Sequence, residues 1–221
     1  MNRDRIYNIA NAFGFTFTGV DSLDYSVSPE RFIVDTLSLS GESLFREESR
    51  LHTLLRTWVR DNSHLLRPEL LVSLGSSLEG ISLRVLGSIC LIAQESDTAS
   101  KRWNRAIRRI LKIVDSDRLY LYPENYPNSR IDQYLSEFGI HYRSVEFQDE
   151  RKFRGLKWMV ENNPWVKNRI LMTVSARADI YTYLSNNETA KEKEVCTELD
   201  VGKSSFYSIK KSFELIRLAH N

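Results

Sequence analysis

Apolar side chains recur at intervals of three and four residues on both sides of Gly202, near the C-terminal end of the sequence. The segment that contains them runs over residues 190–218. Its apolar positions are Val195, Leu199, Phe206, Ile209 and Phe213. This spacing places them on one face of each of two short helices, and the glycine allows a tight connection between the helices. We therefore expect a packed helix pair whose second helix begins at Lys203.

The run EVCTELDVGKSSFYSIKK within this segment resembles the helix-turn-helix superfamily of DNA-binding proteins. Val201 lies where such motifs fill the junction between the helices. Gly202 stands where they usually carry a Ser or Thr that caps the second helix, and Gly caps less well. The resemblance implies that the second helix enters the major groove of double-stranded DNA. It places Ser204, Ser205, Tyr207 and Ser208 at base edges, and Lys203, Lys210 and Lys211 near phosphates.

The residues upstream extend this pattern to three helices. Residues 177–184 place Ile180, Tyr183 and Leu184 on one helical face, and the polar run SNNET then ends that helix. Only three residues follow Leu218, so we expect no β-wing after the second helix. The same periodicity also fits an ordinary helical hairpin packed on the core, and periodicity alone does not separate the two interpretations.

Glycine and proline are scarce, with 9 and 5 among 221 residues, and amphipathic runs cover much of the chain. Because both residues interrupt helices, this composition favours a mainly α fold. We expect a helical N-terminal domain over residues 1–100 with a surface for assembly, and a basic region over residues 101–221. The basic region ends in a helix-turn-helix domain at about 165–221. The expected hinge is residues 96–100.

Five helices are expected before this hinge. They span residues 4–13, 29–39, 42–62, 68–74 and 78–94. The clearest is 42–62, whose apolar residues recur at three and four from Leu44 to Val59. Its long apolar face suggests a homodimer or a protein partner bound through the N-terminal half, because helix-turn-helix proteins commonly bind DNA as two-fold dimers.

A small strand-helix-strand element is expected in the middle of the chain. Residues 118–122 and 141–147 alternate as strands do, and they flank a helical run over 129–138. Gly139 is placed to end that helix. The two strands are expected to pair in parallel.

The charge is divided unevenly along the chain. Residues 1–100 hold 9 Lys and Arg against 13 Asp and Glu, and residues 101–221 hold 22 against 16. The first part thus has a balance of −4 and the second a balance of +6. This asymmetry suggests that the second part contacts a polyanion.

The densest basic run is KRWNRAIRRILK, over residues 101–112, with six positive and no negative charges. Its apolar stripe is Trp103, Ile107, Ile110 and Val114. The cations expected mostly off this stripe are Arg102, Arg105, Arg108, Arg109 and Lys112. They are candidates for contacts with the DNA backbone, since phosphates would relieve their mutual repulsion. The alternative is a solvated helix face.

A second group of cations and aromatic residues spans residues 151–169. Lys152 is its candidate DNA contact, and Trp158 and Trp165 lie among the cations. Aromatic rings between cations can stack on unpaired bases. The helical spacing of Phe153, Leu156, Met159 and Val160 fits core positions better.

Catalytic signatures are weak throughout, and we expect no enzyme activity, no cofactor and no metal. No phosphate-binding glycine loop is present, and His52, His64, His141 and His220 are scattered. The turn GSSLEG lacks the acidic pair of a nucleotidyltransferase. Asp115, Asp117 and Glu124 lack the following E-x-K of a metal-dependent nuclease.

The remaining features suggest a cytoplasmic protein without a membrane segment. Residues 81–93 are too short to span a bilayer, and the N-terminus lacks a secretory signal. Cys90 and Cys196 are expected to be free thiols in a reducing compartment.

Two functions therefore fit the sequence. The first is a DNA-binding protein, either a transcriptional regulator or a component of a mobile-element or phage-defence system. The second is a non-catalytic structural subunit of a protein complex, whose C-terminal helices bind a protein partner.

Overall fold

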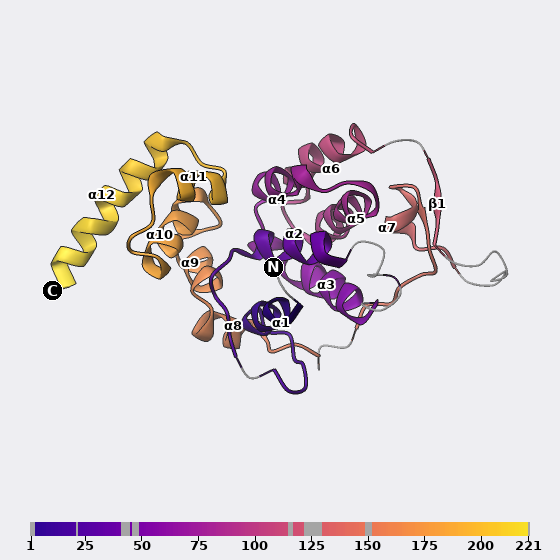
Figure 1. Cartoon of the computed structure of the whole chain (residues 1–221), viewed down its shortest axis with the longest axis horizontal. Helices are drawn as coiled ribbons and strands as arrows, with labels where there is room; N and C mark the ends of the chain where they lie inside the picture. The colour runs from indigo at the N-terminus through magenta and orange to yellow at the C-terminus, as the bar shows by residue number, and fades with distance from the viewer. Residues whose placement is uncertain are drawn as a thin grey trace.

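The computed structural model describes residues 3–20, 22–40, 45, 49–114, 117–121, 130–148 and 152–220, with residues 40 and 217–220 described by their backbone alone. Regular structure in these residues comprises 12 α-helices, short 3₁₀ turns and one pair of two-residue strands (Figure 1). The expected mainly α fold is confirmed. None of the helices within these residues is long and apolar enough to cross a membrane.

Six helices in the first half of the chain enclose one hydrophobic core. They are α1 (Arg3–Ala12), α2 (Pro29–Ser40), α3 (Ser49–Asn62), α4 (Pro68–Leu74), α5 (Gly80–Ser96) and α6 (Asn104–Leu111). α5 is central, since its side chains are buried without a break from Ser82 to Cys90. Gly87 allows close packing here, because a Cβ at this position would collide with the ring of Phe138.

The expected N-terminal helices form within two residues of their expected bounds, with one exception. Of the helix expected over residues 42–62, the structure describes Ser49–Asn62 as α3, and most of the earlier part lies outside the described residues. Of residues 42–48 only Phe45 is described, and its ring packs against those of His52 and Tyr142 at centroid distances of 5.1 and 4.8 Å. The apolar stripe of α3 is buried inside the core, so it does not form an exposed assembly surface.

The expected boundary near residue 100 does not divide the buried side chains. The apolar face of α6 belongs to the same cluster as α5. Residues 96–100 are not a hinge, because the buried carboxylate of Asp97 accepts hydrogen bonds from three following residues. The donors are Ala99 N at 2.9 Å, Arg102 Nε at 2.6 Å and Trp103 Nε1 at 2.9 Å. These bonds hold the start of α6 against α5.

The middle of the chain contains the expected parallel strand pair in a shorter form. β1 (Leu119–Tyr120) pairs with β2 (Ile140–His141). The helix expected over residues 129–138 is only α7 (Gln133–Ser136). α7 cannot begin earlier, because Ile131 pairs with Arg143 in a β-bridge. It begins after Asp132, whose side chain caps it by accepting a hydrogen bond from Leu135 N.

A second, smaller core forms among the C-terminal helices. These are α9 (Pro164–Met172), α10 (Ala176–Asn186), α11 (Glu192–Leu199) and α12 (Lys203–His220), preceded by α8 (Leu156–Asn162). Its buried members are Trp165, Ile180, Tyr183, Leu184, Val195, Leu199, Phe206 and Phe213. This core begins at Trp165, whereas the next residue, Val166, packs in the main core. Figure 1 shows these helices at one end of the molecule and β1 at the other, with α12 extending outward.

Candidate nucleic-acid interface

The connection between α11 and α12 is a three-residue turn. α11 ends at Leu199, and its C-cap, Asp200, donates its N–H to the carbonyl of Cys196. The left-handed backbone of Asp200 (φ 48°) turns the chain so that Val201 N also reaches this carbonyl, at 3.2 Å. The left-handed position is thus taken by an aspartate, which tolerates it better than most residues, and not by the glycine. The carbonyl of Gly202 accepts the first hydrogen bond of α12, from Phe206 N at 3.1 Å. Gly202 is therefore the N-cap of α12, as expected from the sequence.

The expected apolar face packs the two helices together. Val195, Leu199 and Phe206 are fully buried, and Ile209 is half-buried. The ring of Phe213 meets that of Tyr181 in α10 edge to face, with centroids 5.3 Å apart. α12 therefore packs on α10 and α11, and its opposite face remains exposed.

The residues that the sequence places at DNA lie mostly on that exposed face. Six are exposed and one is half-buried: Lys203, Ser204, Ser205, Tyr207, Ser208 and Lys211 are exposed, and Lys210 is half-buried. Tyr207 is 56% exposed, which is high for a large aromatic side chain. The structure thus brings these side chains together on the first half of α12.

One acidic residue on this face was not identified from the sequence. Glu192, in the first turn of α11, accepts a hydrogen bond from Tyr207 Oη at 2.6 Å. It also forms an ion pair with Lys203, whose Nζ lies 3.0 Å away. The hydrogen bond from Tyr207, followed by that from Lys203, lowers the pKa of Glu192 below its usual value. The same contact raises the pKa of Lys203.

A buried charge network attaches the C-terminal helices to the main core. Arg169 of α9 bonds both carboxylate oxygens of Glu30 at 2.8 and 2.9 Å, and its Nε bonds Asp179 at 2.7 Å. Arg67 reaches the other oxygen of Asp179 at 2.7 Å. Burial alone would lower the pKa of Arg169, but the carboxylates of Asp179 and Glu30 raise it. This network fixes α10, and with it the packed helices α11 and α12, relative to α2 and α4.

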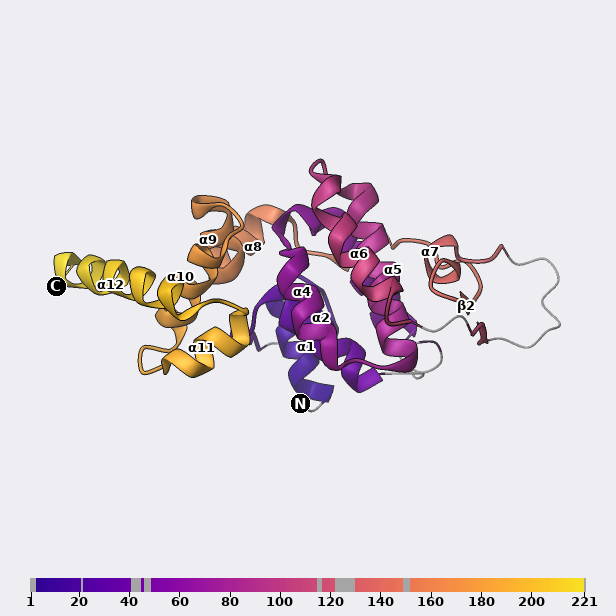
Figure 2. The same cartoon turned by 90° about the horizontal axis from the view of Figure 1, so that it is seen from above.

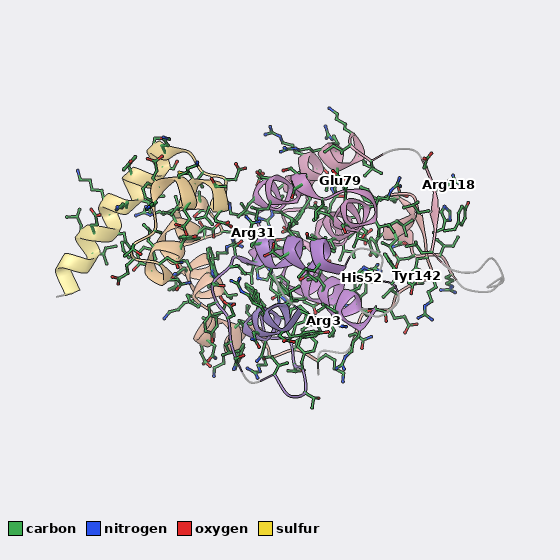
Figure 3. The ribbon with its side chains drawn as sticks, in the orientation of Figure 1. Arg3, Arg31, His52, Glu79, Arg118 and Tyr142 are labelled. Atoms are coloured by element: carbon green, nitrogen blue, oxygen red, sulfur yellow. The ribbon has the colours of Figure 1, made fainter. Side chains whose placement is uncertain are left out.

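A second contact crosses the same junction at the surface. Arg31 of α2 lies 2.7 Å from Glu198 near the end of α11. Figure 3 shows Arg31 on the side of the main core that faces the C-terminal helices. The C-terminal helices are therefore held against the main core by both buried and partly exposed ion pairs.

α6 presents its cations to solvent. A 3₁₀ turn, Ser100–Trp103, leads into the helix. Trp103, Ile107 and Ile110 are buried and Val114 is half-buried, so the expected apolar stripe is confirmed. The exposed cations are Lys101, Arg105, Arg108, Arg109 and Lys112.

Arg102 differs from the other cations of this run. It is half-buried, donates to Asp97 and to the carbonyl of Ser63 at 2.7 Å, and lies over the ring of Trp103. These contacts serve the fold. Arg102 is therefore a structural residue of the main core and not one of the exposed cations.

The five exposed cations, three in α6 and one on either side of it, line a groove of about 870 Å³, here named the basic groove. Its other walls are Pro68, Glu69 and Val72 of α4, and Asp200 of the turn between α11 and α12. The groove thus extends from α6 to Asp200, in the turn between α11 and α12. In Figure 2, α4 lies between α6 and α11, and α12 extends away from them to the far end of the molecule.

Lys152 lies elsewhere. Its carbonyl accepts hydrogen bonds from Thr16 N and Oγ1, next to the β-bridge between Phe15 and Phe153. The side chain is exposed, but this segment adjoins α1 and α8, on the lower side of Figure 1, whereas α6 lies on the upper side. The aromatic residues nearby serve the fold, since Trp165 is buried and Trp158 lies under Arg154 at 4.2 Å.

The described residues hold no cluster of three or more His, Cys, Asp or Glu side chains that would suit a metal ion. Figure 3 shows His52 next to Tyr142 on the main core, far from α12. Burial, followed by the nearby charge of Arg56, lowers the pKa of His52 to about 3, which keeps the imidazole neutral. Cys90 and Cys196 are free thiols, the first buried and the second half-buried. Asp115 and Glu124 lie outside the described residues.

No protein-family model, no curated protein and no solved structure gives a significant match to this chain.

Proposed function

We propose that the protein binds double-stranded DNA, with α12 in the major groove and α6 along the phosphate backbone. The observation that carries the proposal is the basic groove, because it links the cations of α6 to the turn that begins α12. None of the five groove cations has an ion-pair partner among the described residues. Unpaired cations on one helix repel one another, and phosphates relieve that repulsion.

The two contact surfaces are held at a fixed spacing in this proposal. The network of Arg169, Glu30 and Asp179 joins α9 and α10 to α2, and α6 packs on the same core. A duplex seated on α12 would therefore meet α6 at a defined distance along its backbone. The bound region then extends beyond the few base pairs that a single helix reads.

The proposed activity is binding without catalysis. It suits a transcriptional regulator, or the DNA-binding component of a mobile-element or phage-defence system. Both roles need a protein that recognises a DNA site, and both fit a helix-turn-helix fixed to a larger helical body.

Apolar side chains at the end of the molecule support a second candidate, a structural subunit whose C-terminal helices bind a protein. Leu171 is 69% exposed and Leu215 is 59% exposed, and Ile170 and Ile216 are also exposed. A groove of about 240 Å³ between α9, α10 and α12 adjoins them. A protein partner would cover such a surface, and so would a second copy of this chain.

A mobility-shift assay with duplex DNA of random sequence, at two salt concentrations, tests the main proposal. Binding that weakens steeply with salt supports it, because neutralised phosphates release counterions. Absence of binding at low salt would overturn it and favour the protein-partner candidate.

A further inference from the structure

Both carboxylate oxygens of Glu192 are engaged by side chains of α12. Oε2 accepts the hydroxyl hydrogen of Tyr207 at 2.6 Å, and Oε1 lies 3.0 Å from Lys203 Nζ. Lys203 and Tyr207 are four residues apart, so they lie on one stripe of the helix. Glu192 therefore ties the first turn of α11 to the part of α12 that faces the proposed DNA.

These contacts contribute little to the stability of the fold. The side chain of Lys203 is 79% exposed, and exposed ion pairs are worth little because water screens them. The buried contacts of Val195, Leu199 and Phe206 already hold the two helices together. The arrangement matters instead for what this surface presents to a ligand.

The direction of the hydrogen bond follows from the chemistry of the two groups. An ionised carboxylate only accepts hydrogen bonds, so the hydroxyl of Tyr207 must donate its single proton to Glu192. The lowered pKa of Glu192 keeps the carboxylate ionised at neutral pH. The exposed oxygen of Tyr207 then retains only lone pairs, and it acts toward any other group as an acceptor.

The major groove offers both kinds of partner. Adenine and cytosine present amino groups there, and guanine and thymine present carbonyl oxygens. An oxygen with no free proton, next to a carboxylate, attracts an amino group. It repels a carbonyl oxygen, since two acceptors then face each other without a hydrogen.

We propose that Glu192 is a positioning residue that makes the hydroxyl of Tyr207 an obligate acceptor, and so selects an amino base over a keto base at the position that Tyr207 reads. The favoured bases are adenine and cytosine on the contacted strand. This inference rests on the proposed binding of DNA. It adds a recognition rule to that function.

The test measures binding to four duplexes that differ in one base. The preferred site is first selected from randomised DNA, and the position read by Tyr207 is the one whose base preference changes in Tyr207→Phe. The unchanged protein should bind adenine and cytosine there about fivefold to tenfold more tightly than guanine and thymine, the lower range for one lost base contact. Glu192→Gln should reduce this ratio to within about twofold, because an amide can donate to Tyr207 and free its proton.

Glu214→Gln is the matched control. It removes the same charge from α12, where Glu214 lies 3.9 Å from Lys210, but it does not contact Tyr207. This variant should keep the amino-to-keto ratio of the unchanged protein. Thermal unfolding of each variant shows that the fold is retained.

Three results would overturn the inference while leaving DNA binding in place. They are a preference for keto bases, a Tyr207→Phe variant that alters no position, and a Glu192→Gln variant that keeps the ratio. Failure to bind any duplex would overturn the proposed function as well, so the two failures are distinguishable.

Discussion

The guanidinium of Arg169 forms a two-point ion pair with Glu30, a residue 139 positions earlier in the chain, and both side chains are fully buried. Asp179 accepts from the Nε of the same arginine, and the carbonyl of Leu65 accepts from Nη1. Four separate segments thus meet at one cation. Arg169 is thus the buried centre of the contacts that hold α9 and α10 against the main core, which the ion pairs of Arg67 with Asp179 and of Arg31 with Glu198 supplement.

Arg169→Met should therefore destabilise the protein by about 3–5 kcal/mol, because it leaves buried Glu30 and Asp179 without their cation. Denaturant unfolding measures the change. Arg177→Met, which removes an exposed arginine from α10, is the control and should change the free energy of unfolding by less than about 0.5 kcal/mol. A loss below about 1 kcal/mol in Arg169→Met would contradict the assigned role.

The free energy of unfolding should depend on pH because the imidazole of His52 is buried. The pKa of this group is lowered from 6.5 to about 3 in the folded state, so between these values the unfolded chain binds a proton that the folded chain does not. Stability is then fully present above pH 6.5 and falls as the pH drops below it, by about 1.4 kcal/mol per pH unit.

His52→Phe removes this titration. Between pH 4 and 6.5 its free energy of unfolding should therefore fall by about 1.4 kcal/mol less per pH unit than that of the unchanged protein. His141→Gln is the control, since it leaves His52 in place and should keep the slope. Unfolding free energies measured at half-unit pH steps give the comparison. A profile that is unchanged in His52→Phe would mean that other groups cause the acid sensitivity.

Periodicity in the sequence predicted the packed helix pair α11 and α12 because its packing is local. Val195, Leu199 and Phe206 lie within twelve residues, and their burial follows from helical spacing alone. The position of Gly202 also predicted the turn, although the left-handed residue is Asp200.

The attachment of that motif could not be predicted in the same way. Glu30 and Arg169 are too distant in sequence for any pattern to pair them, and a buried ion pair looks like two surface charges in a sequence. The contact of Glu192 with Tyr207 was missed for a related reason, since it depends on how two helices cross. The division expected at residue 100 was wrong because a shift in charge along the chain does not coincide with a gap in the core.

The lysines of α12 give a direct test of the DNA contacts. Lys203→Ala with Lys211→Ala should flatten the slope of log K against log salt concentration by about 1.8, at about 0.9 per lost phosphate contact. Lys157→Ala with Lys167→Ala removes the same charge from exposed positions on α8 and α9, and it should leave the slope nearly unchanged. An equal effect of both double variants would show that only net charge matters.

The cations of α6 should strengthen binding to every DNA sequence by a similar factor. Arg105 and Arg109 are exposed and line the basic groove, whereas the apolar stripe of the helix is inside the core. Replacing both by Glu should weaken binding to preferred and random duplexes about equally, because contacts with phosphates carry no base information.

Arg102→Glu supplies the contrast: it should lower the unfolding temperature, since Arg102 bonds Asp97 and Ser63. Weaker binding to the preferred sequence alone would show that Arg105 and Arg109 read bases, and a lower unfolding temperature in the double variant would assign them to the fold.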